Sequence, residues 1–279
     1  MKGGRMAASV IDRFRELVVD ESDPFYFDHP LDHVPGMLLF SGLLELAVRA
    51  DELRSRGRPG RVVAGLGFTR FCELRTATSL SCTPVPGPNR AWTVAARQSG
   101  EEVCAGSIAF ADDGPAAPDC ARAAAPAPSR QTPSRQAPAE LVHRHRPENV
   151  LVGEPVRRGR GVVEAAVLEP PAGPEPPPPF RGPVELVEAG RQFATMLEHQ
   201  EHGRPMDVTL LWVALRLDIP YRLDRDVPLL LRWPTARVSG RRSHCAVTLA
   251  DAATGADLGS LTYEAQAVDP EQYARARAR

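Results

Sequence analysis

Apolar and polar residues follow one another along this chain in two patterns, one typical of helices and one typical of strands. Residues 37–50 and 184–199 place apolar side chains at the spacing of an amphipathic helix. Each helix is followed by four segments with the alternation and turn residues of antiparallel strands. These segments are residues 61–74, 78–85, 91–98 and 103–111, and then 207–221, 227–238, 244–252 and 258–268. The pattern predicts an α+β protein in which antiparallel sheets wrap around buried helices.

The order of these elements in the first half returns in the second half. The strand sequence Gly-Ser-Ile-Ala-Phe at 106–110 has a counterpart, Gly-Ser-Leu-Thr-Tyr, at 259–263. A repeat of helix and strands at a nearly constant offset indicates an internal duplication. Between the halves lies a stretch of Ala, Pro, Ser and Arg that is too poor in large apolar residues to form a core. We expect a first repeat over 1–111, a linker over 112–139 and a second repeat over 140–279.

Composition excludes several classes of protein. The 279 residues are 43% apolar and 25% charged with a net charge of −1, so no overall field attracts nucleic acid or an anionic membrane. No apolar run approaches the ~20 residues that span a bilayer, and the first residues lack a signal peptide's apolar core. The five cysteines are odd in number and scattered, which argues against zinc or disulfides and favours the reducing cytoplasm. His143 and His145 are expected to be solvated.

One segment carries a specific resemblance to a known family. Asp23–Gly36 reads DPFYFDHPLDHVPG, runs directly into the first helix, and resembles the A-factor biosynthesis hotdog family. The same resemblance extends into the second half through NVLVGEPV at Asn149–Val156 and VEAGRQ at Val187–Gln192. It implies a tandem (double) hotdog fold, with two antiparallel sheets that each wrap on a central helix.

The resemblance also implies an activity. The family contains the γ-butyrolactone autoregulator synthases of actinomycetes, which transfer a β-ketoacyl group from acyl carrier protein to the hydroxyl of dihydroxyacetone phosphate. It implies those two partners, no cofactor besides the phosphopantetheine of the carrier, and no metal, nucleic acid or membrane. A single lysine among 34 Lys and Arg residues suits a GC-rich actinomycete genome. We expect a cytoplasmic monomer, because tandem repeats supply their own pairing. Acyl length and product type, butyrolactone or furan, stay open.

Each half keeps a different part of the family pattern. The family's helix carries a glutamate and an arginine at i and i+3, followed by glutamine. The second half has all three, as Glu188, Arg191 and Gln192, whereas the first half has Ser41, Leu44 and Glu45. The first half keeps the histidine loop, with Asp28, His29, Asp32 and His33, where the second half has a run of prolines. In dehydratase-type hotdog dimers such a loop faces the helix of the other subunit, so one composite site per chain is predicted.

By this resemblance, Glu188, Arg191, His29 and His33 are the candidate catalytic residues, and Gly36, Met37, Gln192 and Asp28 the candidate substrate-binding residues. Burial would raise the pKa of Glu188 toward that of a general base, or Arg191 would hold it ionised. Arg191 would clamp a phosphate or fix the glutamate. The amides of Gly36 and Met37 would stabilise an oxyanion, and the histidines would position the acceptor hydroxyl or carry its proton.

Three other interpretations remain open. An i, i+3 Glu/Arg pair is commonly a solvated ion pair, and histidines beside aspartates commonly make turn hydrogen bonds. Ser41 and Leu44 stand where the family has its glutamate and arginine. Their presence would suit a non-catalytic hotdog protein that binds acyl chains or a carrier protein. A hotdog dehydratase or thioesterase would use a similar set of residues.

Overall fold

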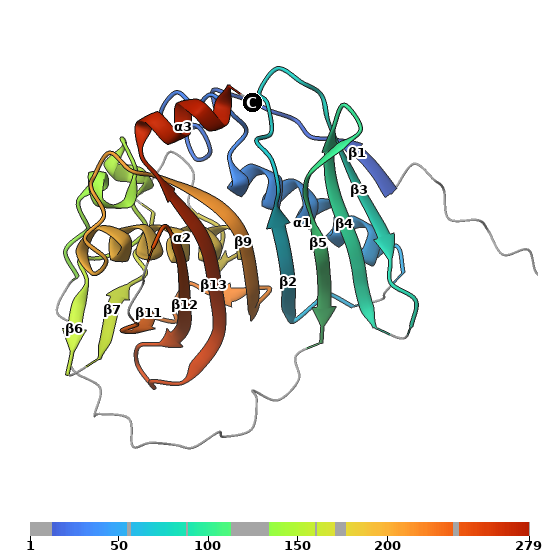
Figure 1. Ribbon diagram of the computed structural model, residues 1–279. Coiled ribbons are helices and arrows are strands. Elements are labelled where there is room, and N and C mark those ends of the chain that lie inside the picture. Colours follow the sequence, from blue (N-terminus) through green and yellow to red (C-terminus); the bar gives the residue numbers. More distant parts are fainter. Residues whose placement is uncertain are drawn as a thin grey trace, which may run out of the picture.

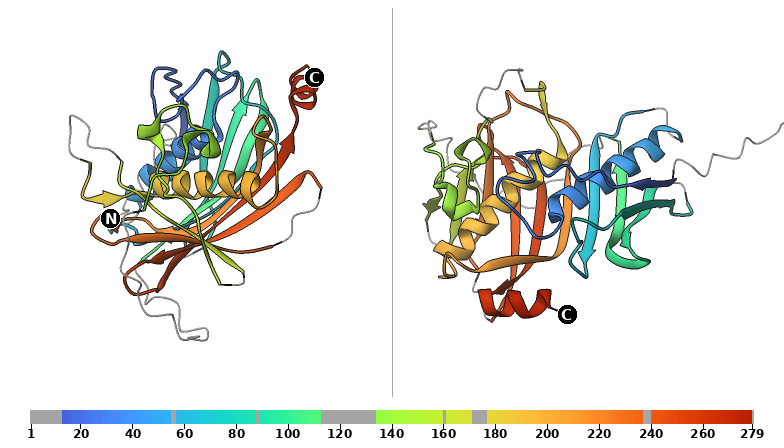
Figure 2. Two further views of the ribbon diagram at one scale, coloured as in Figure 1. Left: turned by 90° about the vertical axis from the view of Figure 1, so that its left-hand side faces the viewer. Right: turned by 90° about the horizontal axis from the view of Figure 1, so that it is seen from above.

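The computed structural model describes residues 13–54, 57–87, 89–112, 134–159, 161–170, 177–236 and 240–278. Two long helices, α1 (Gly36–Glu52) and α2 (Pro183–Gln200), lie on one face of a large antiparallel sheet, and the strands curve around them (Figures 1 and 2). The predicted α+β class, with sheet wrapped on buried helices, is confirmed by this arrangement.

Within the described residues the main sheet has the strand order β1-β3-β4-β5-β2-β9-β13-β12-β11-β7-β6. In chain order its strands are β1 (Phe14–Glu16), β2 (Arg61–Phe68), β3 (Thr78–Pro84), β4 (Arg90–Gln98), β5 (Glu101–Ala111), β6 (Val156–Arg158), β7 (Val162–Ala166), β9 (Thr209–Pro220), β11 (Leu229–Pro234), β12 (Arg242–Asp251) and β13 (Asp257–Val268). The other elements are the paired strands β8 (Phe180–Arg181) and β10 (Leu223–Asp224), the 3-10 turns η2 (Ala139–Val142) and η3 (Pro147–Asn149), and helix α3 (Pro270–Arg277).

The two sheets expected from the sequence form one continuous sheet, joined where β2 pairs antiparallel with β9. Outward from this junction the strands run β2, β5, β4, β3, β1 on one side and β9, β13, β12, β11, β7, β6 on the other. Arg61 reinforces the junction, because its Nη2 donates to Oδ1 of Asp218 at 2.6 Å and its Nη1 to the carbonyl of Leu258 at 3.0 Å. The shared hydrogen-bond ladder fixes the position of α1 relative to α2.

Part of the expected linker packs against the second half. Residues 113–133 lie outside the described residues, but 134–139 are described. Ala137 is 4% exposed, and its amide donates to the carbonyl of Val152 at 3.0 Å. The side-chain amide of Gln136 donates to the carbonyl of Pro147 at 2.7 Å. These last residues therefore belong structurally with the second half.

Helix α2 approaches β13 closely at a glycine. The hydroxyl of Tyr263 donates to the carbonyl of Val187 at 2.7 Å, which pins the ring beneath the helix. A Cβ on Gly190 would lie 2.3 Å from that hydroxyl oxygen and 2.6 Å from Cδ1 of Leu261. Both distances are far below van der Waals contact, so the close approach of α2 to the sheet requires glycine at this position.

Replacing Gly190 with alanine is expected to lower the free energy of unfolding by about 2–3 kcal/mol, because overpacking must displace a pinned ring or the helix. The matched control is Gly42→Ala in α1, whose Cβ would meet only the terminal methyl carbons of Leu17 and Leu80, at 2.7 and 2.9 Å. Those ends can rotate, and alanine favours the helix by about 1 kcal/mol, so the control should cost far less. Urea denaturation measures both, and equal losses would contradict this account.

Among the described residues, no helix is both long enough and apolar enough to cross a membrane. Four cysteines, Cys72, Cys82, Cys104 and Cys245, are buried and carry free thiols. Cys120 lies outside the described residues.

Candidate functional site

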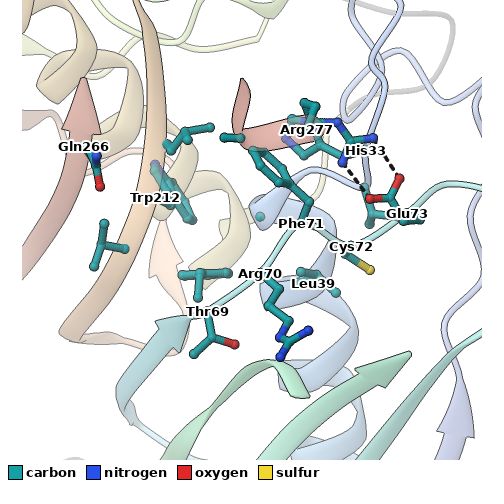
Figure 3. A pocket seen from close by; sticks show the side chains of 16 residues that line it. His33, Leu39, Thr69, Arg70, Phe71, Cys72, Glu73, Trp212, Gln266 and Arg277 are labelled. Atoms are coloured by element: carbon teal, nitrogen blue, oxygen red, sulfur yellow. Dashed lines mark hydrogen bonds and ion pairs between the residues drawn. The ribbon is translucent and has the colours of Figure 1, made fainter. Parts of the chain in front are cut away.

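A cavity of about 560 Å³ lies where α1 begins, and both halves of the chain line it. Its walls come from the start of α1, the loop after β2, strand β9, strand β13 and helix α3. The lining includes His33, Gly36, Phe68, Phe71, Trp212 and Arg277. Figure 3 shows His33 and Arg277 together at one end, with Trp212 and Gln266 toward the other. A concave site of this size, with aromatic walls and a few polar groups, is typical of small-molecule binding.

His33 is paired with a carboxylate at the edge of this cavity. Its Nδ1 lies 2.7 Å from Oδ1 of Asp32, and the hydroxyl of Tyr273 in α3 donates to the same oxygen at 2.5 Å. An imidazole that donates its Nδ1–H to a carboxylate keeps the lone pair on Nε2. Because His33 lines the cavity, this arrangement suits a general base that is oriented by an acidic partner.

The amino end of α1 meets the same cavity. Helix α1 begins at Gly36, after Pro35, which provides no side-chain cap. The first amides of a helix have no partner within it, and the helix dipole adds positive potential there. Gly36 lines the cavity, whereas the side chain of Met37 is buried. The Gly36 amide is therefore suited to stabilise an oxyanion in the cavity.

Trp212 separates this cavity from a smaller inner one. A Cβ on Gly36 would lie 2.9 Å from Cε3 of Trp212, so glycine allows the indole to pack on the start of α1. The inner cavity has about 20 Å³ and is lined by Arg191, Trp212 and Tyr263 among others. That volume holds about one water molecule. In this conformation a substrate is confined to the outer cavity.

Glu188 lies in a buried ion cluster in α2, not in the cavity lining. Its side chain is 0% exposed. Oε1 accepts hydrogen bonds from Nη2 of Arg144 at 2.6 Å, Nη2 of Arg191 at 2.7 Å and Nε2 of Gln192 at 2.8 Å. Oε2 accepts from Nε of Arg191 at 2.7 Å. Charged donors thus surround both oxygens.

These contacts decide between the two states that the sequence left open for Glu188. Burial alone would raise its pKa, but the charges of Arg191 and Arg144 and the donated hydrogen bonds outweigh burial and lower the pKa to about 2. A carboxylate held ionised this firmly is a weak base at neutral pH. The geometry therefore favours Glu188 as an anchor, and it favours the alternative in which Arg191 fixes the glutamate over the one in which it clamps a phosphate.

Asp28 and His29 lie at the contact between the two halves. Asp28 is 5% exposed and accepts hydrogen bonds from the amides of His145 and Arg146 and from the side chain of Asn149. The His29 ring stacks on His145 with centroids 4.5 Å apart, and burial together with His145 lowers the pKa of His29. Neither residue lines the cavity. Their contacts fasten the histidine loop to the second half.

The structure brings the candidate residues together in two groups instead of one. The histidine loop does face α2, since Arg144 donates to the carbonyl of Phe25 at 2.9 Å and also to Glu188. The cavity holds His33 and Gly36, and the buried cluster holds Glu188, Arg191 and Gln192. The geometry thus divides the expected composite site into a cavity and an adjacent ion cluster that braces it.

The described part of the histidine loop's counterpart in the second half contains a buried arginine. Residues 171–176 lie outside the described residues, and Phe180–Arg181 form β8, which pairs with β10. Arg181 is 3% exposed, donates to the carbonyl of Val227 at 3.0 Å and pairs with Glu169. In the described residues 177–183 of this counterpart, a buried arginine stands where the first half has its histidine–aspartate pair.

Arg144, Trp212 and Tyr273 make contacts that no local sequence pattern indicated. Arg144 sits in a stretch rich in His and Arg, which resembles a solvated surface segment. Tyr273 lies 241 residues from Asp32. The available signal was Val142, an apolar residue directly before this basic stretch, which is 0% exposed and places the segment against the core.

His143, which was expected to be solvated, instead packs against α2. Its Nε2 lies 2.8 Å from Nε2 of His199, and burial, His199 and Arg191 lower the pKa of His143 to about 4. In the described parts of the chain, no group of three or more His, Cys, Asp or Glu is arranged to hold a metal ion. The two rings form a hydrogen-bonded contact between this segment and α2.

Acidification is expected to destabilise the fold through His143. The unfolded chain has the ordinary histidine pKa near 6.5, so between pH 6.5 and 4 the unfolded state binds more protons. The contribution of His143 to the free energy of unfolding is therefore complete above pH 6.5. It decreases as the pH falls, by about 2 kcal/mol at pH 5. Urea unfolding at pH 7 and pH 5 should show this loss, and His143→Gln should reduce it. His244→Gln, at a site 62% exposed, should not, and an unchanged loss in His143→Gln would contradict the assignment.

The family model that matches this chain lies mainly on its second half. Residues 125–269 match the family model described as the A-factor biosynthesis hotdog domain, which is more than half of the chain. The match includes the Glu188 cluster and leaves out Asp23–Gly36. A Streptomyces virginiae protein named 2-oxo-3-(phosphooxy)propyl 3-oxoalkanoate synthase is 38% identical over 72 residues, 25% of this chain and 23% of that protein. The chain thus aligns with about a quarter of that relative's length.

Solved structures match nearly the whole chain. A protein of unknown function with a hotdog fold from Alicyclobacillus acidocaldarius has a TM-score of 0.63 at 15% identity, covering 95% of this chain and 96% of that one. The dehydratase domain of the polyketide PpsC from Mycobacterium tuberculosis has a TM-score of 0.59 at 16% identity, covering 92% and 93%. A putative thioesterase II from Thermobifida fusca has 0.55 at 18%, covering 88% and 90%. These likenesses confirm the hotdog fold, and at such identities they show the fold alone.

Proposed function

This chain belongs to the A-factor biosynthesis hotdog domain family, and we propose that it transfers a β-ketoacyl group from the thioester of an acyl carrier protein to the hydroxyl of dihydroxyacetone phosphate. The observation that carries the proposal is the Asp32–His33 pair, which meets the amino end of α1 at one cavity. The name of the Streptomyces virginiae relative describes an ester of a 3-oxo acid with a phosphorylated three-carbon alcohol, which is the product of this transfer.

The proposed reaction uses His33 as a general base. Nε2 of His33 removes the proton of the acceptor hydroxyl, and the hydroxyl oxygen attacks the carbonyl carbon of the thioester. Negative charge moves onto the carbonyl oxygen, where the Gly36 amide and the α1 dipole stabilise it. The tetrahedral intermediate then expels the carrier thiolate, which takes the proton from the His33 imidazolium. Asp32 stays ionised and stabilises that imidazolium.

The cavity walls provide contacts for both substrates. Phe68, Phe71 and Trp212 offer apolar surface for the acyl group and the pantetheine arm. Arg70 also lines the cavity and supplies positive charge for the acceptor phosphate. The buried Glu188 cluster holds the histidine loop in a fixed position against α2 without touching the substrates. No proposed step requires a metal or a second copy of this chain.

The direct test is to incubate the protein with a β-ketoacyl carrier-protein thioester, with and without dihydroxyacetone phosphate, and to analyse the products by mass spectrometry. The phosphorylated ester, or its dehydrated butenolide, should appear only with the acceptor. Release of free β-keto acid at the same rate with and without the acceptor would indicate a thioesterase instead. Tight acyl binding with no product of either kind would indicate a non-catalytic binding protein. Dehydration of a β-hydroxyacyl thioester is not expected, because Glu188 is buried and fully paired.

A further inference from the structure

Helix α3 forms one wall of the cavity. It follows directly on β13 and begins at Pro270, one residue beyond the end of the family match. Ala276 and Arg277, in its last turn, line the cavity. In Figure 1 the helix lies beside the loop that precedes α1, although the two are at opposite ends of the chain. The cavity thus combines the histidine loop and the start of α1 with a helix from the other end of the chain.

Local sequence explains why α3 forms but not why it lies there. Asp269 caps it by accepting a hydrogen bond from the amide of Gln272 at 2.8 Å, and Pro270 occupies the first turn. Arg275 pairs with Glu271 one turn earlier. The helix buries none of its described side chains, so apolar packing contributes little to holding it. Its position depends on Tyr273 and Arg277.

Both of these residues converge on Asp32. The Tyr273 hydroxyl donates to Oδ1 at 2.5 Å, and Nε of Arg277 lies 3.2 Å from Oδ2. Arg277 is itself anchored, because it donates to Glu73 at 2.6 and 2.8 Å and lies 4.8 Å over the Phe71 ring. The side chain of Asp32 is 50% exposed. Without these donors a half-exposed aspartate would be free to rotate away from His33 into water.

We infer that α3 is a positioning element of the acyl-transfer site: Tyr273 and Arg277 hold both oxygens of Asp32, so that Asp32 keeps the Nδ1–H tautomer of His33 and leaves Nε2 toward the cavity. The inference rests on the proposed function for its role in the reaction, but the tautomer itself does not. Tyr273 and Arg277 act through Asp32 and are not themselves catalytic residues. This adds the carboxyl-terminal helix to the parts of the chain that the site requires.

The electrostatics of the group agree with this arrangement. Burial would raise the pKa of Asp32, but the hydrogen bonds from Tyr273 and His33 and the charge of Arg277 lower it. Burial and the neighbouring carboxylate raise the pKa of Tyr273 well above its usual range, so its hydroxyl remains a donor at neutral pH. The titratable and charged groups that face Asp32 are His33, Tyr273, Arg277 and Glu73, of which Glu73 is paired with Arg277. Asp32 is therefore an ionised acceptor throughout the neutral range.

The experiment compares the whole 279-residue chain with three variants that each carry one substitution. Tyr273→Phe removes the hydroxyl and keeps the ring on Phe71, 5.6 Å between centroids. Arg277→Gln removes the second donor. Arg275→Gln is the matched control, because this arginine lies on the same helix and pairs with Glu271 at the surface. Nitrogen-15 NMR of the histidine rings reports the tautomer of His33, whose signal is assigned by its loss in His33→Gln. The pH profiles of kcat and KM are measured in parallel.

Wild type and Arg275→Gln should show His33 protonated at Nδ1. Tyr273→Phe and Arg277→Gln should show a mixture of tautomers, with kcat about tenfold lower and KM little changed, as is usual when a residue that orients a functional imidazole is removed. An unchanged tautomer and pH profile in both variants would overturn the inference. If Arg275→Gln has an equal effect, the changes come from disturbing helix α3 as a whole and not from the contacts of Tyr273 and Arg277 with Asp32. If no transfer occurs at all, the proposed function fails, and the NMR result still decides the inference.

Discussion

Replacing His33 with glutamine is expected to lower kcat for acyl transfer by about 10²–10⁴-fold, the usual contribution of a general base. The imidazole pairs with Asp32 at 2.7 Å and lines the cavity with Gly36, so its loss removes the proton acceptor but not the oxyanion donor. The melting temperature should change little, because the Asp32 carboxylate that pairs with His33 is 50% exposed and solvent can replace the lost hydrogen bond. Single-turnover transfer from an acyl carrier protein measures the chemical step.

His244→Gln is the control for this loss, because His244 is 62% exposed on β12 and does not line the cavity. It should leave kcat as in the wild type. The more informative comparison is His29→Gln in the same loop. If His29→Gln loses transfer and His33→Gln keeps it, the base lies at the contact between the halves, and the assignment of the cavity is wrong.

Replacing Glu188 with glutamine is expected to lower the free energy of unfolding by about 3–5 kcal/mol. The substitution leaves the charges of Arg144 and Arg191 buried without their counterion, although the glutamine keeps the size and one acceptor oxygen. These arginines are 7% and 17% exposed at the side chain, so water cannot take over the role of the carboxylate. Urea denaturation at pH 7 gives the change, with the slope of the transition checked for two-state unfolding.

Glu45→Gln in α1 is the matched control. Glu45 also pairs with two arginines, Arg15 at 2.6 Å and Arg49 at 3.0 Å, but its side chain is 46% exposed. Solvent screens such pairs, so its loss should cost less than about 1 kcal/mol. If Glu188→Gln is as stable as the wild type and has lost transfer, Glu188 takes part in the reaction, and its description as an anchor is wrong.

Much of the fold follows from local pattern. The spacing of apolar residues predicted helices at 37–50 and 184–199, and the structure has them at Gly36–Glu52 and Pro183–Gln200. The eight predicted strand segments correspond to β2, β3, β4, β5, β9, β11, β12 and β13. The pairing of β2 with β9 could not be predicted from pattern, because an edge strand and a central strand carry the same alternation. Short elements such as β1, β6 and β8 have too few residues to show a period.

The site was harder to predict because its chemistry depends on long-range contacts. His33 and Gly36 were named from one continuous segment, and they do line one cavity. The state of Glu188 depends on Arg144, a residue 44 positions away whose approach follows from the packing of the histidine loop. The sequence therefore left two opposite pKa shifts open, and the tertiary contacts were needed to choose between them.

The β2–β9 junction has a consequence for how such a site can diverge. In a homodimer each substitution appears in both subunits, so a loss in one active site is a loss in the other. Here the central pairing is made within one polypeptide, and a change in one half is not copied to the other. By the predicted duplication and the family resemblance, Ser41 stands at a glutamate position in one half while Glu188 remains in the other, and prolines stand at one histidine loop while His33 remains. Covalent fusion thus permits asymmetry that an identical pair of subunits would forbid.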